Sequence, residues 1–182
     1  SLLRNEDVIG IMPTGAGKSI CFQIPALCKA GLTLVFSPLI SLMKDQVDGL
    51  LVQNIPAALI NSTLTQAEFN KTMYEVRSGK IKLLYIAPER LGSNFFCNVL
   101  RALPIAQVIV DEAHCISEWG HDFRPSYRLI GEWLNSLPKR PIVGAFTATA
   151  TKYVENDIKK LLGLDKANVY VTGFDRPNLS FS

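Results

Sequence analysis

The chain has 182 residues, of which 48% are hydrophobic and 19% are charged, and its formal net charge is +3. That length suits one domain with a sizeable core, and that composition excludes a disordered chain. No apolar run approaches the length of a membrane span, and no signal peptide is recognisable. The chain begins with Ser1, so we expect a processed or excised piece of a longer protein. The small positive charge permits a polyanionic partner without requiring one.

The four cysteines have apolar neighbours and form no C-x-x-C pair: Cys21, Cys28, Cys97 and Cys115. This pattern predicts buried or part-buried thiols in a reducing compartment. Neither histidine lies at ligand spacing from a pair of cysteines, so we expect no zinc site.

The first chemical signal follows a short apolar strand predicted at 8–12. The segment 13–19 has the sequence P-T-G-A-G-K-S, and a helix is predicted at 20–30, closed by Gly31. A strand, a Gly-rich loop and a helix are the context of a phosphate-binding loop. The backbone of Thr14, Gly15, Ala16 and Gly17 would then hold phosphates, Lys18 would reach the β and γ phosphates, and Ser19 would bind Mg²⁺. The strict motif has Gly at the position that Met12 occupies here. A chance Gly-rich turn before a helix is the less favoured alternative.

Strands and helices then alternate to the end of the chain. Further strands are predicted at 32–36, 57–60, 81–87, 108–110, 142–146 and 168–172. Helices are predicted from the turn at 37–41 to about 53, and at 65–78, 95–103, 127–137 and 152–162. The segment 61–63 is predicted to cap the helix at 65–78. The alternation predicts an α/β fold whose parallel sheet is covered on both faces. Polar residues near the strand ends should therefore meet at one edge: Lys18, Ser37, Glu89, Asp111 and Thr147.

Two adjacent carboxylates follow the apolar strand at 108–110. Phosphoryl chemistry needs a metal ligand and a group that orients or deprotonates water. Asp111 is the candidate Mg²⁺ ligand, together with Ser19, and Glu112 is the candidate base. The alternative, a solvated helix N-cap, is the minority interpretation because a phosphate loop lies upstream.

An aromatic and basic segment, 115–125, follows the acid pair and contains Trp119, His121, Phe123 and Arg124. Exposed aromatic side chains can stack on nucleic-acid bases of any sequence. Core packing is the alternative for Trp119 and Phe123, but their glycine, histidine and acid neighbours make a poor core segment. By itself, His121 would be an ordinary surface histidine.

In order, the segments 12–19, 37–46, 85–91, 111–114 and 145–150 resemble the motifs of superfamily-2 helicases. The segment 115–125 is similar to the aromatic-rich loop of RecQ-type DNA helicases, and the likeness covers nearly the whole chain. It implies a RecA-like P-loop NTPase fold, a three-layer sandwich with a mostly parallel central sheet. Residues 1–172 would form the first motor lobe, and 173–182 a linker toward a second lobe. The family's glutamine motif for adenine would precede Ser1.

The resemblance implies 3′-to-5′ DNA unwinding driven by ATP hydrolysis, in replication, recombination and repair. Lys18, Ser19, Asp111 and Glu112 would bind and hydrolyse Mg-ATP, with His114 coupling nucleotide state to DNA. The implied set for DNA binding and coupling is Ser37, Pro38, Lys44, Arg90, Trp119, His121, Phe123, Arg124, Thr147 and Thr149. Taken by themselves, Ser37, Pro38 and Lys44 are better explained as an ordinary strand-to-helix turn.

The implied partners are single-stranded and forked DNA and a second RecA-like lobe of the same polypeptide, with no membrane and a monomeric fragment. The expected location is the cytoplasm, at the nucleoid, for a bacterial protein, and the nucleus for a eukaryotic one. Without a second lobe and its arginine finger, we expect weak ATP binding and very slow hydrolysis. An RNA helicase lobe and a non-enzymatic ATP-binding module are the alternatives. The aromatic-rich segment disfavours the first, and the intact Lys18, Asp111 and Glu112 disfavour the second.

Overall fold

The computed structural model describes residues 1–172; the predicted linker at 173–182 lies outside the described residues. One seven-stranded sheet runs through the molecule in the order β3-β4-β2-β5-β6-β1-β7, and its strand pairs are parallel. The strands are β1 (Val8–Ile11), β2 (Leu32–Phe36), β3 (Ala57–Ile60), β4 (Leu83–Ile86), β5 (Ile105–Val110), β6 (Ile142–Thr147) and β7 (Asn168–Val171).

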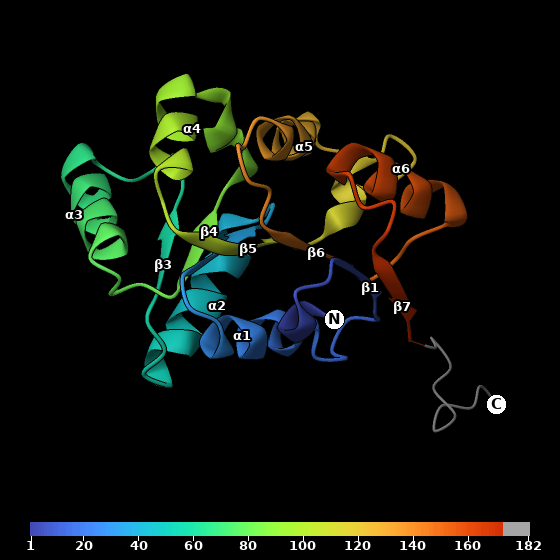
Figure 1. Ribbon diagram of the computed structural model, residues 1–182, viewed down its shortest axis with the longest axis horizontal. Coiled ribbons are helices and arrows are strands. Elements are labelled where there is room, and N and C mark those ends of the chain that lie inside the picture. Colours follow the sequence, from blue (N-terminus) through green and yellow to red (C-terminus); the bar gives the residue numbers. More distant parts are fainter. Residues whose placement is uncertain (173–182) are drawn as a thin grey trace.

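Helices cover both faces of this sheet, so the molecule has three layers (Figure 1). The helices are α1 (Lys18–Cys28), α2 (Ile40–Val52), α3 (Gln66–Arg77), α4 (Asn94–Arg101), α5 (Arg128–Asn135) and α6 (Lys152–Leu162). α1 and α2 pack on one face, and α3 to α6 pack on the other. Four short 3₁₀ turns join them: η1 (Leu2–Arg4), η2 (Pro88–Gly92), η3 (Ala113–Ile116) and η4 (Pro125–Tyr127).

The continuous apolar runs of the central strands follow from this double cover. In β2, Leu34 and Phe36 belong to the core beneath α3 to α6, whereas Val35 belongs to the core beneath α1 and α2. Successive side chains of a strand point to opposite faces, so a strand buried on both faces has no polar position to alternate with. The predicted α/β fold with a covered parallel sheet is confirmed.

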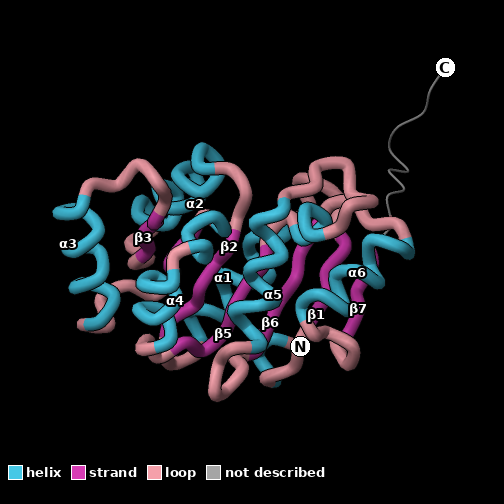
Figure 2. The backbone as a smooth tube through the Cα atoms, turned by 90° about the horizontal axis from the view of Figure 1, so that it is seen from above, coloured by secondary structure: helices cyan, strands magenta, loops and turns pink. Residues whose placement is uncertain are grey.

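The carboxyl ends of the four central strands meet at one edge, as the sequence predicted (Figure 2). Ile11 of β1 pairs with Thr147 of β6, and Phe36 of β2 pairs with Val110 of β5. The segments after β1, β2, β5 and β6 therefore leave the sheet side by side. This brings residues from four distant parts of the chain into one site.

The predicted cap of the α3 helix was wrong. Thr65, not the segment 61–63, is the N-cap, and its side chain and that of Glu68 form a reciprocal capping box. Asn61 accepts a hydrogen bond from the backbone N–H of Thr63 at 2.9 Å instead. In an Asx turn and in an N-cap alike, a side-chain oxygen accepts a hydrogen bond from a backbone N–H. The residue types alone therefore do not distinguish the two motifs.

The predicted burial of the cysteines was half right. Cys97 and Cys115 are buried, but Cys21 and Cys28 are exposed. Both exposed thiols lie on α1, which buries Phe22, Pro25 and Ala26 and leaves the cysteines on its outer side. Within the described residues, no helix is long and apolar enough to cross a membrane.

Candidate nucleotide and nucleic-acid site

The loop between β1 and α1 has the conformation that its glycines allow. Gly15 has φ 83° and Gly17 has φ 82°, both in the left-handed region that other residues rarely adopt. Gly17 is the N-cap of α1 and contributes no side-chain hydrogen bond to the helix. Backbone N–H groups of the first helical turn are then available to an anion, and the helix dipole favours one there. Thr14, Gly15 and Ala16 are exposed, so the loop is open to a ligand of phosphate type.

Lys18 is the first residue of α1, and its side chain meets the acid pair across the sheet edge. Its Nζ lies 3.2 Å from Oε1 of Glu112, and the Lys18 side chain is only 11% exposed. The other oxygen of Glu112, Oε2, lies 3.3 Å from Nδ1 of His114. Burial opposes ionisation of Glu112, but the contacts with His114 and Lys18 outweigh it and lower the pKa of this carboxyl. Glu112 is therefore ionised at neutral pH.

Asp111 lies deeper, at the tip of β5, and is only 4% exposed. Burial, followed by the charge of Glu112, raises the pKa of Asp111 to about 6. A buried carboxylate whose ionisation is opposed in this way favours an added cation, because the cation would offset both effects. The Asp111 carboxylate and the Ser19 hydroxyl are hard oxygen donors of the kind that Mg²⁺ prefers, so these residues fit that ion.

His114 connects the acid pair to the next strand. Its Nδ1 lies 2.8 Å from Oγ1 of Thr147, the last residue of β6. Its ring stacks on the ring of His121, with centroids 4.1 Å apart and planes 16° apart. Nδ1 of His121 lies 3.5 Å from Oγ1 of Thr149. A continuous set of contacts thus joins Glu112 to the aromatic segment.

The aromatic segment forms a closed loop on the surface. The backbone N–H of Arg124 donates to the carbonyl of Cys115 at 2.8 Å, which holds the two ends of the loop together. Gly120 packs so tightly that an added Cβ would lie 2.4 Å from the carbonyl oxygen of His114. Trp119 is 78% exposed, so the core-packing alternative was wrong for this residue. Phe123 is half-buried beneath the Arg128 guanidinium, which lies 5.1 Å from the ring centroid.

Arg124 fastens this loop to the segment after β2. Its Nη1 donates to the carbonyl of Pro38 at 3.0 Å, and its Nε and Nη2 donate to Oδ2 of Asp122. Pro38 and Ser37 are buried, and Lys44 is exposed on α2. Of the three residues predicted to bind DNA near β2, Pro38 thus contacts Arg124 through its backbone carbonyl, and Lys44 is exposed.

Arg90 is placed differently from the other predicted DNA-binding residues. Its guanidinium lies 5.6 Å from the ring centroid of Phe69 and 5.0 Å from that of Phe96. These are residues of α3 and α4, so Arg90 packs between two helices rather than beside Trp119. Its binding role stays a prediction, and packing explains its position without one.

Sequence reasoning missed two groups that support the site. The hydroxyl of Ser117 is fully buried and donates to Oδ2 of Asp157 on α6 at 2.5 Å, which attaches the aromatic loop to that helix. The Tyr127 hydroxyl donates to the backbone carbonyl of Asp111 at 2.9 Å, and burial raises the Tyr127 pKa well above its usual value. Neither pair has a local signal, because each joins residues that are 16 or 40 positions apart.

Comparison with known proteins places these features in a family. The family described as DEAD/DEAH box helicase matches residues 1–157. Over 171 residues the chain is 54% identical to the ATP-dependent DNA helicase RecQ of Bacillus subtilis (strain 168), covering 94% of this chain and 29% of that protein. It is 43% identical over 182 residues to the bifunctional 3′-5′ exonuclease/ATP-dependent helicase WRN of Mus musculus, covering 98% of this chain and 12% of that protein. The chain thus spans less than a third of the length of these relatives.

Solved structures show the same fold. The Hef helicase domain of Pyrococcus furiosus superposes with a TM-score of 0.71 at 18% identity, covering 93% of this chain and 35% of that one. A hypothetical ATP-dependent RNA helicase from Sulfolobus tokodaii superposes with a TM-score of 0.70 at 20% identity, covering 94% and 49%. At these identities the likeness concerns the fold alone, and it confirms the three-layer P-loop NTPase fold that the sequence predicted.

Proposed function

We propose, because the chain belongs to the DEAD/DEAH box helicase family, that it is the ATP-binding motor lobe of a DNA helicase of the RecQ type. In the complete protein, ATP hydrolysis would drive 3′-to-5′ movement on single-stranded DNA and unwinding of duplexes, in replication, recombination and repair. The observation that carries this proposal is the continuous set of contacts from Lys18 through Glu112 and His114 to His121. It joins a phosphate loop to a surface loop that presents Trp119.

The predicted residues would divide the roles in the nucleotide half of the site. The backbone of 14–17 and Lys18 would hold the phosphates of ATP, and Ser19 and Asp111 would hold Mg²⁺. When bound, Mg-ATP would supply the phosphoryl group, and its Mg²⁺ would place positive charge beside the Asp111 carboxylate. Glu112 would accept a proton from water at Oε1 or Oε2, because its lowered pKa keeps it ionised at neutral pH. His114 would hold the Glu112 carboxylate in position through Nδ1.

The nucleic-acid half would be the aromatic loop. An exposed tryptophan can stack on any base, and such a contact contributes about 1–3 kcal/mol. Stacking without sequence preference suits a motor that moves along a strand. A DNA substrate is favoured over RNA because the Bacillus subtilis relative, 54% identical to this chain, is named an ATP-dependent DNA helicase. We infer that the protein acts in the compartment that holds the genome, the bacterial cytoplasm or the eukaryotic nucleus.

The described lobe alone would lack a group that rapid ATP hydrolysis needs. A second RecA-like lobe of the same polypeptide would supply an arginine finger, which can contribute about 10³–10⁵ in rate. We therefore expect the 182-residue chain alone to bind ATP weakly and to hydrolyse it very slowly. Turnover by the isolated chain at the rate of the complete protein would contradict this expectation.

The test uses the full-length protein and compares Lys18→Ala with Glu112→Gln. Both variants should lose DNA-stimulated ATP hydrolysis by about 100-fold or more, because each removes a group that acts on the reacting phosphate or water. Only Glu112→Gln should retain binding of a fluorescent ATP analogue, because it keeps the shape of the side chain and leaves Lys18 free. Hydrolysis that survives in Glu112→Gln would remove Glu112 from the role of base.

Substrate class and direction are tested with the unchanged protein. We expect single-stranded DNA to stimulate ATP hydrolysis more than single-stranded RNA does, and a duplex with a 3′ tail to unwind where one with a 5′ tail does not. Equal or stronger stimulation by RNA would favour an RNA helicase instead. ATP binding without stimulation by either polymer would favour a non-enzymatic module.

A further inference from the structure

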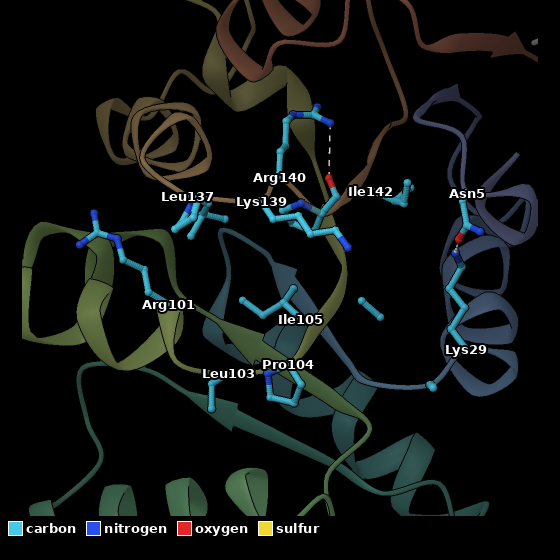
Figure 3. A pocket seen from close by; sticks show the side chains of 14 residues that line it. Asn5, Lys29, Arg101, Leu103, Pro104, Ile105, Leu137, Lys139, Arg140 and Ile142 are labelled. Carbon is cyan, nitrogen blue, oxygen red and sulfur yellow. Dashed lines mark hydrogen bonds between the residues drawn. The ribbon is translucent and has the colours of Figure 1, made fainter.

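A large cavity lies at the opposite edge of the sheet, at the amino ends of β2, β5 and β6 (Figure 3). Its volume is about 740 Å³, within the range of sites that hold small ligands or short peptide segments. These strands are five or six residues long and separate the cavity from the nucleotide edge by roughly 15–20 Å. The nucleotide and nucleic-acid site therefore does not account for this cavity.

The floor of the cavity is apolar and aliphatic. It is formed by Leu103 and Pro104, which precede β5, by Ile105 at the start of β5, and by Leu137 and Pro138 from the segment after α5. None of the 14 lining residues is aromatic. The floor can accept an apolar side chain, but it offers no ring on which a nucleic-acid base could stack.

The rim of the cavity carries four cations, Lys29, Arg101, Lys139 and Arg140, and none of its lining residues is Asp or Glu. Arg140 is neutralised, because it forms an ion pair with Asp7 at 2.8 Å. The other three cations have no carboxylate partner within residues 1–172. In the view of Figure 3, Arg101 and Lys29 stand on opposite sides, with Lys139 between them.

The three unneutralised cations have only neutral contacts. Lys29 donates to the side-chain oxygen of Asn5, and Arg101 donates to Asn98 Oδ1 at 2.6 Å and to Ser136 Oγ at 2.7 Å. The side chain of Lys139 is exposed and makes no hydrogen bond or ion pair within the described residues. Lys29 and Arg101 are therefore held in place without losing their positive charge.

Compensation of helix dipoles explains part of this charge but not all of it. α1, α4 and α5 end beside the cavity, and each helix end carries roughly half a negative charge. Three cations against three such ends leave a surplus of about one and a half positive charges. Compensation of the helix dipoles also does not explain the apolar floor, because a cation can lie beside a helix end without any cavity.

We propose that this cavity binds an acidic peptide segment of a partner protein. One leucine or phenylalanine of the segment enters the apolar floor, and flanking carboxylates meet Lys29, Arg101 and Lys139. Arg101 can receive a carboxylate through its three remaining N–H groups, because two of its five donate to Asn98 and Ser136. A phosphate backbone would use the cations but not the floor, so the two features together favour a peptide over a nucleic acid. Because the cavity lies opposite the nucleotide edge, the partner can stay bound while the motor works.

The test measures the binding of a fluorescently labelled synthetic peptide to the full-length protein by fluorescence anisotropy. The peptide consists of two aspartates, one phenylalanine and two further aspartates. We expect a dissociation constant on the order of 10 µM. Lys139→Glu should weaken binding at least tenfold, because it reverses a charge at the rim. Lys71→Glu reverses a charge that is also exposed, on α3, and should change the affinity by less than twofold. DNA-stimulated ATP hydrolysis of Lys139→Glu should stay within twofold of the unchanged protein, which also shows that this variant folds.

Two further peptides and one competitor decide between the possible ligands. A peptide with alanine in place of phenylalanine should bind at least tenfold more weakly, and a 15-nucleotide oligo-dT should not displace the labelled peptide. Equal binding of the alanine peptide, or unchanged binding by Lys139→Glu, would overturn the proposal. Displacement by oligo-dT that is lost in Lys139→Glu would assign the cavity to nucleic acid instead. A photo-crosslinking group at the phenylalanine should attach within 137–142 or 103–106.

Discussion

Nδ1 of His114 lies 2.8 Å from the hydroxyl of Thr147, although 33 positions separate the two residues in the chain. The same nitrogen lies 3.3 Å from Oε2 of Glu112. One buried ring nitrogen thus lies between a carboxylate after β5 and a hydroxyl at the end of β6, two strands that are neighbours in the sheet. Because the ring also stacks on His121, a shift of the aromatic loop can reach the Glu112 carboxylate through a single side chain.

This relationship predicts the effect of Thr147→Ala in the full-length protein. Without the hydroxyl, the His114 ring loses the contact that orients it, so we expect DNA-stimulated ATP hydrolysis to fall by about tenfold, the equivalent of one lost hydrogen bond of about 1.4 kcal/mol. Basal hydrolysis without DNA should fall by less than threefold. Thr147→Ser keeps the hydroxyl and should restore most of the stimulation. If Thr147→Ala and Thr147→Ser behave alike, the hydroxyl has no part in coupling.

The exposure of Trp119 predicts a separation of DNA response from hydrolysis. Trp119→Ala should raise the concentration of single-stranded DNA needed for half-maximal stimulation by about tenfold, because one stacking contact of about 1–3 kcal/mol is lost. The ATPase rate without DNA should be unchanged, since the 78% exposed side chain supports no core. Phe95→Ala is the matched control, because Phe95 is 67% exposed on α4, away from the loop. Equal losses in both variants, or an equal loss of basal rate, would contradict the stacking role.

Binding of single-stranded DNA should also weaken as salt is raised. Each neutralised phosphate of a single strand contributes a slope of about 0.7 in log affinity against log salt. The measurement is a titration of DNA binding at several salt concentrations. Affinity that does not respond to salt would contradict a surface that follows the phosphate backbone.

The raised pKa of Asp111 predicts that this side chain destabilises the metal-free protein. The pKa of the Asp111 carboxyl is near 3.8 in the unfolded chain and about 6 in the folded protein, so the folded state binds this proton more tightly. The contribution of Asp111 to stability therefore falls as pH rises from about 4 to about 6. Above pH 6 the full penalty applies. Asp111→Asn should therefore be more stable than the unchanged protein at pH 7.5 without Mg²⁺, by about 1–3 kcal/mol.

Chemical denaturation at pH 4 and at pH 7.5 checks this prediction. The stability advantage of Asp111→Asn should shrink toward zero at pH 4, where the wild-type carboxyl is protonated. Mg²⁺ with an ATP analogue should stabilise the unchanged protein more than the variant, because only the unchanged protein keeps the carboxylate ligand. An Asp111→Asn variant that is less stable at pH 7.5 would contradict the prediction.

Two helical glycines predict opposite effects of the same substitution. Gly131 of α5 lies so close to α6 that an added Cβ would be 2.0 Å from the carbonyl oxygen of Leu161. Gly131→Ala must push the two helices apart, and we expect a loss of about 3 kcal/mol in the free energy of unfolding. An added Cβ at Gly49 of α2 would meet nothing within 4 Å, so Gly49→Ala should stabilise by about 0.5–1 kcal/mol through helix propensity. Urea denaturation of both variants measures the contrast, and similar effects at both positions would refute the packing argument.

Much of the fold and half of the site could be predicted from the sequence, because both depend on local patterns. Apolar runs of strand length between helical segments indicate a parallel sheet, whatever the details of packing. The glycines at 15 and 17 and the lysine that follows them mark the phosphate loop, and the acid pair marks the end of the strand beside it. Since all parallel strands end at one edge, order along the chain was enough to bring Lys18, Asp111 and Thr147 together.

Only the tertiary structure decided which side chains touch. It placed Arg90 between two phenylalanine rings, turned Cys21 and Cys28 outward, and stacked His121 on His114. The position of Arg90 and the orientation of the cysteines depend on packing against segments that are distant in the chain, and the stacking depends on how the loop at 115–124 folds back on itself. No local periodicity encodes these outcomes. The sequence by itself determined the parts of the site and the edge on which they meet. Packing between distant residues determined which of those parts are in contact, because side-chain geometry is set by neighbours that the local pattern does not contain.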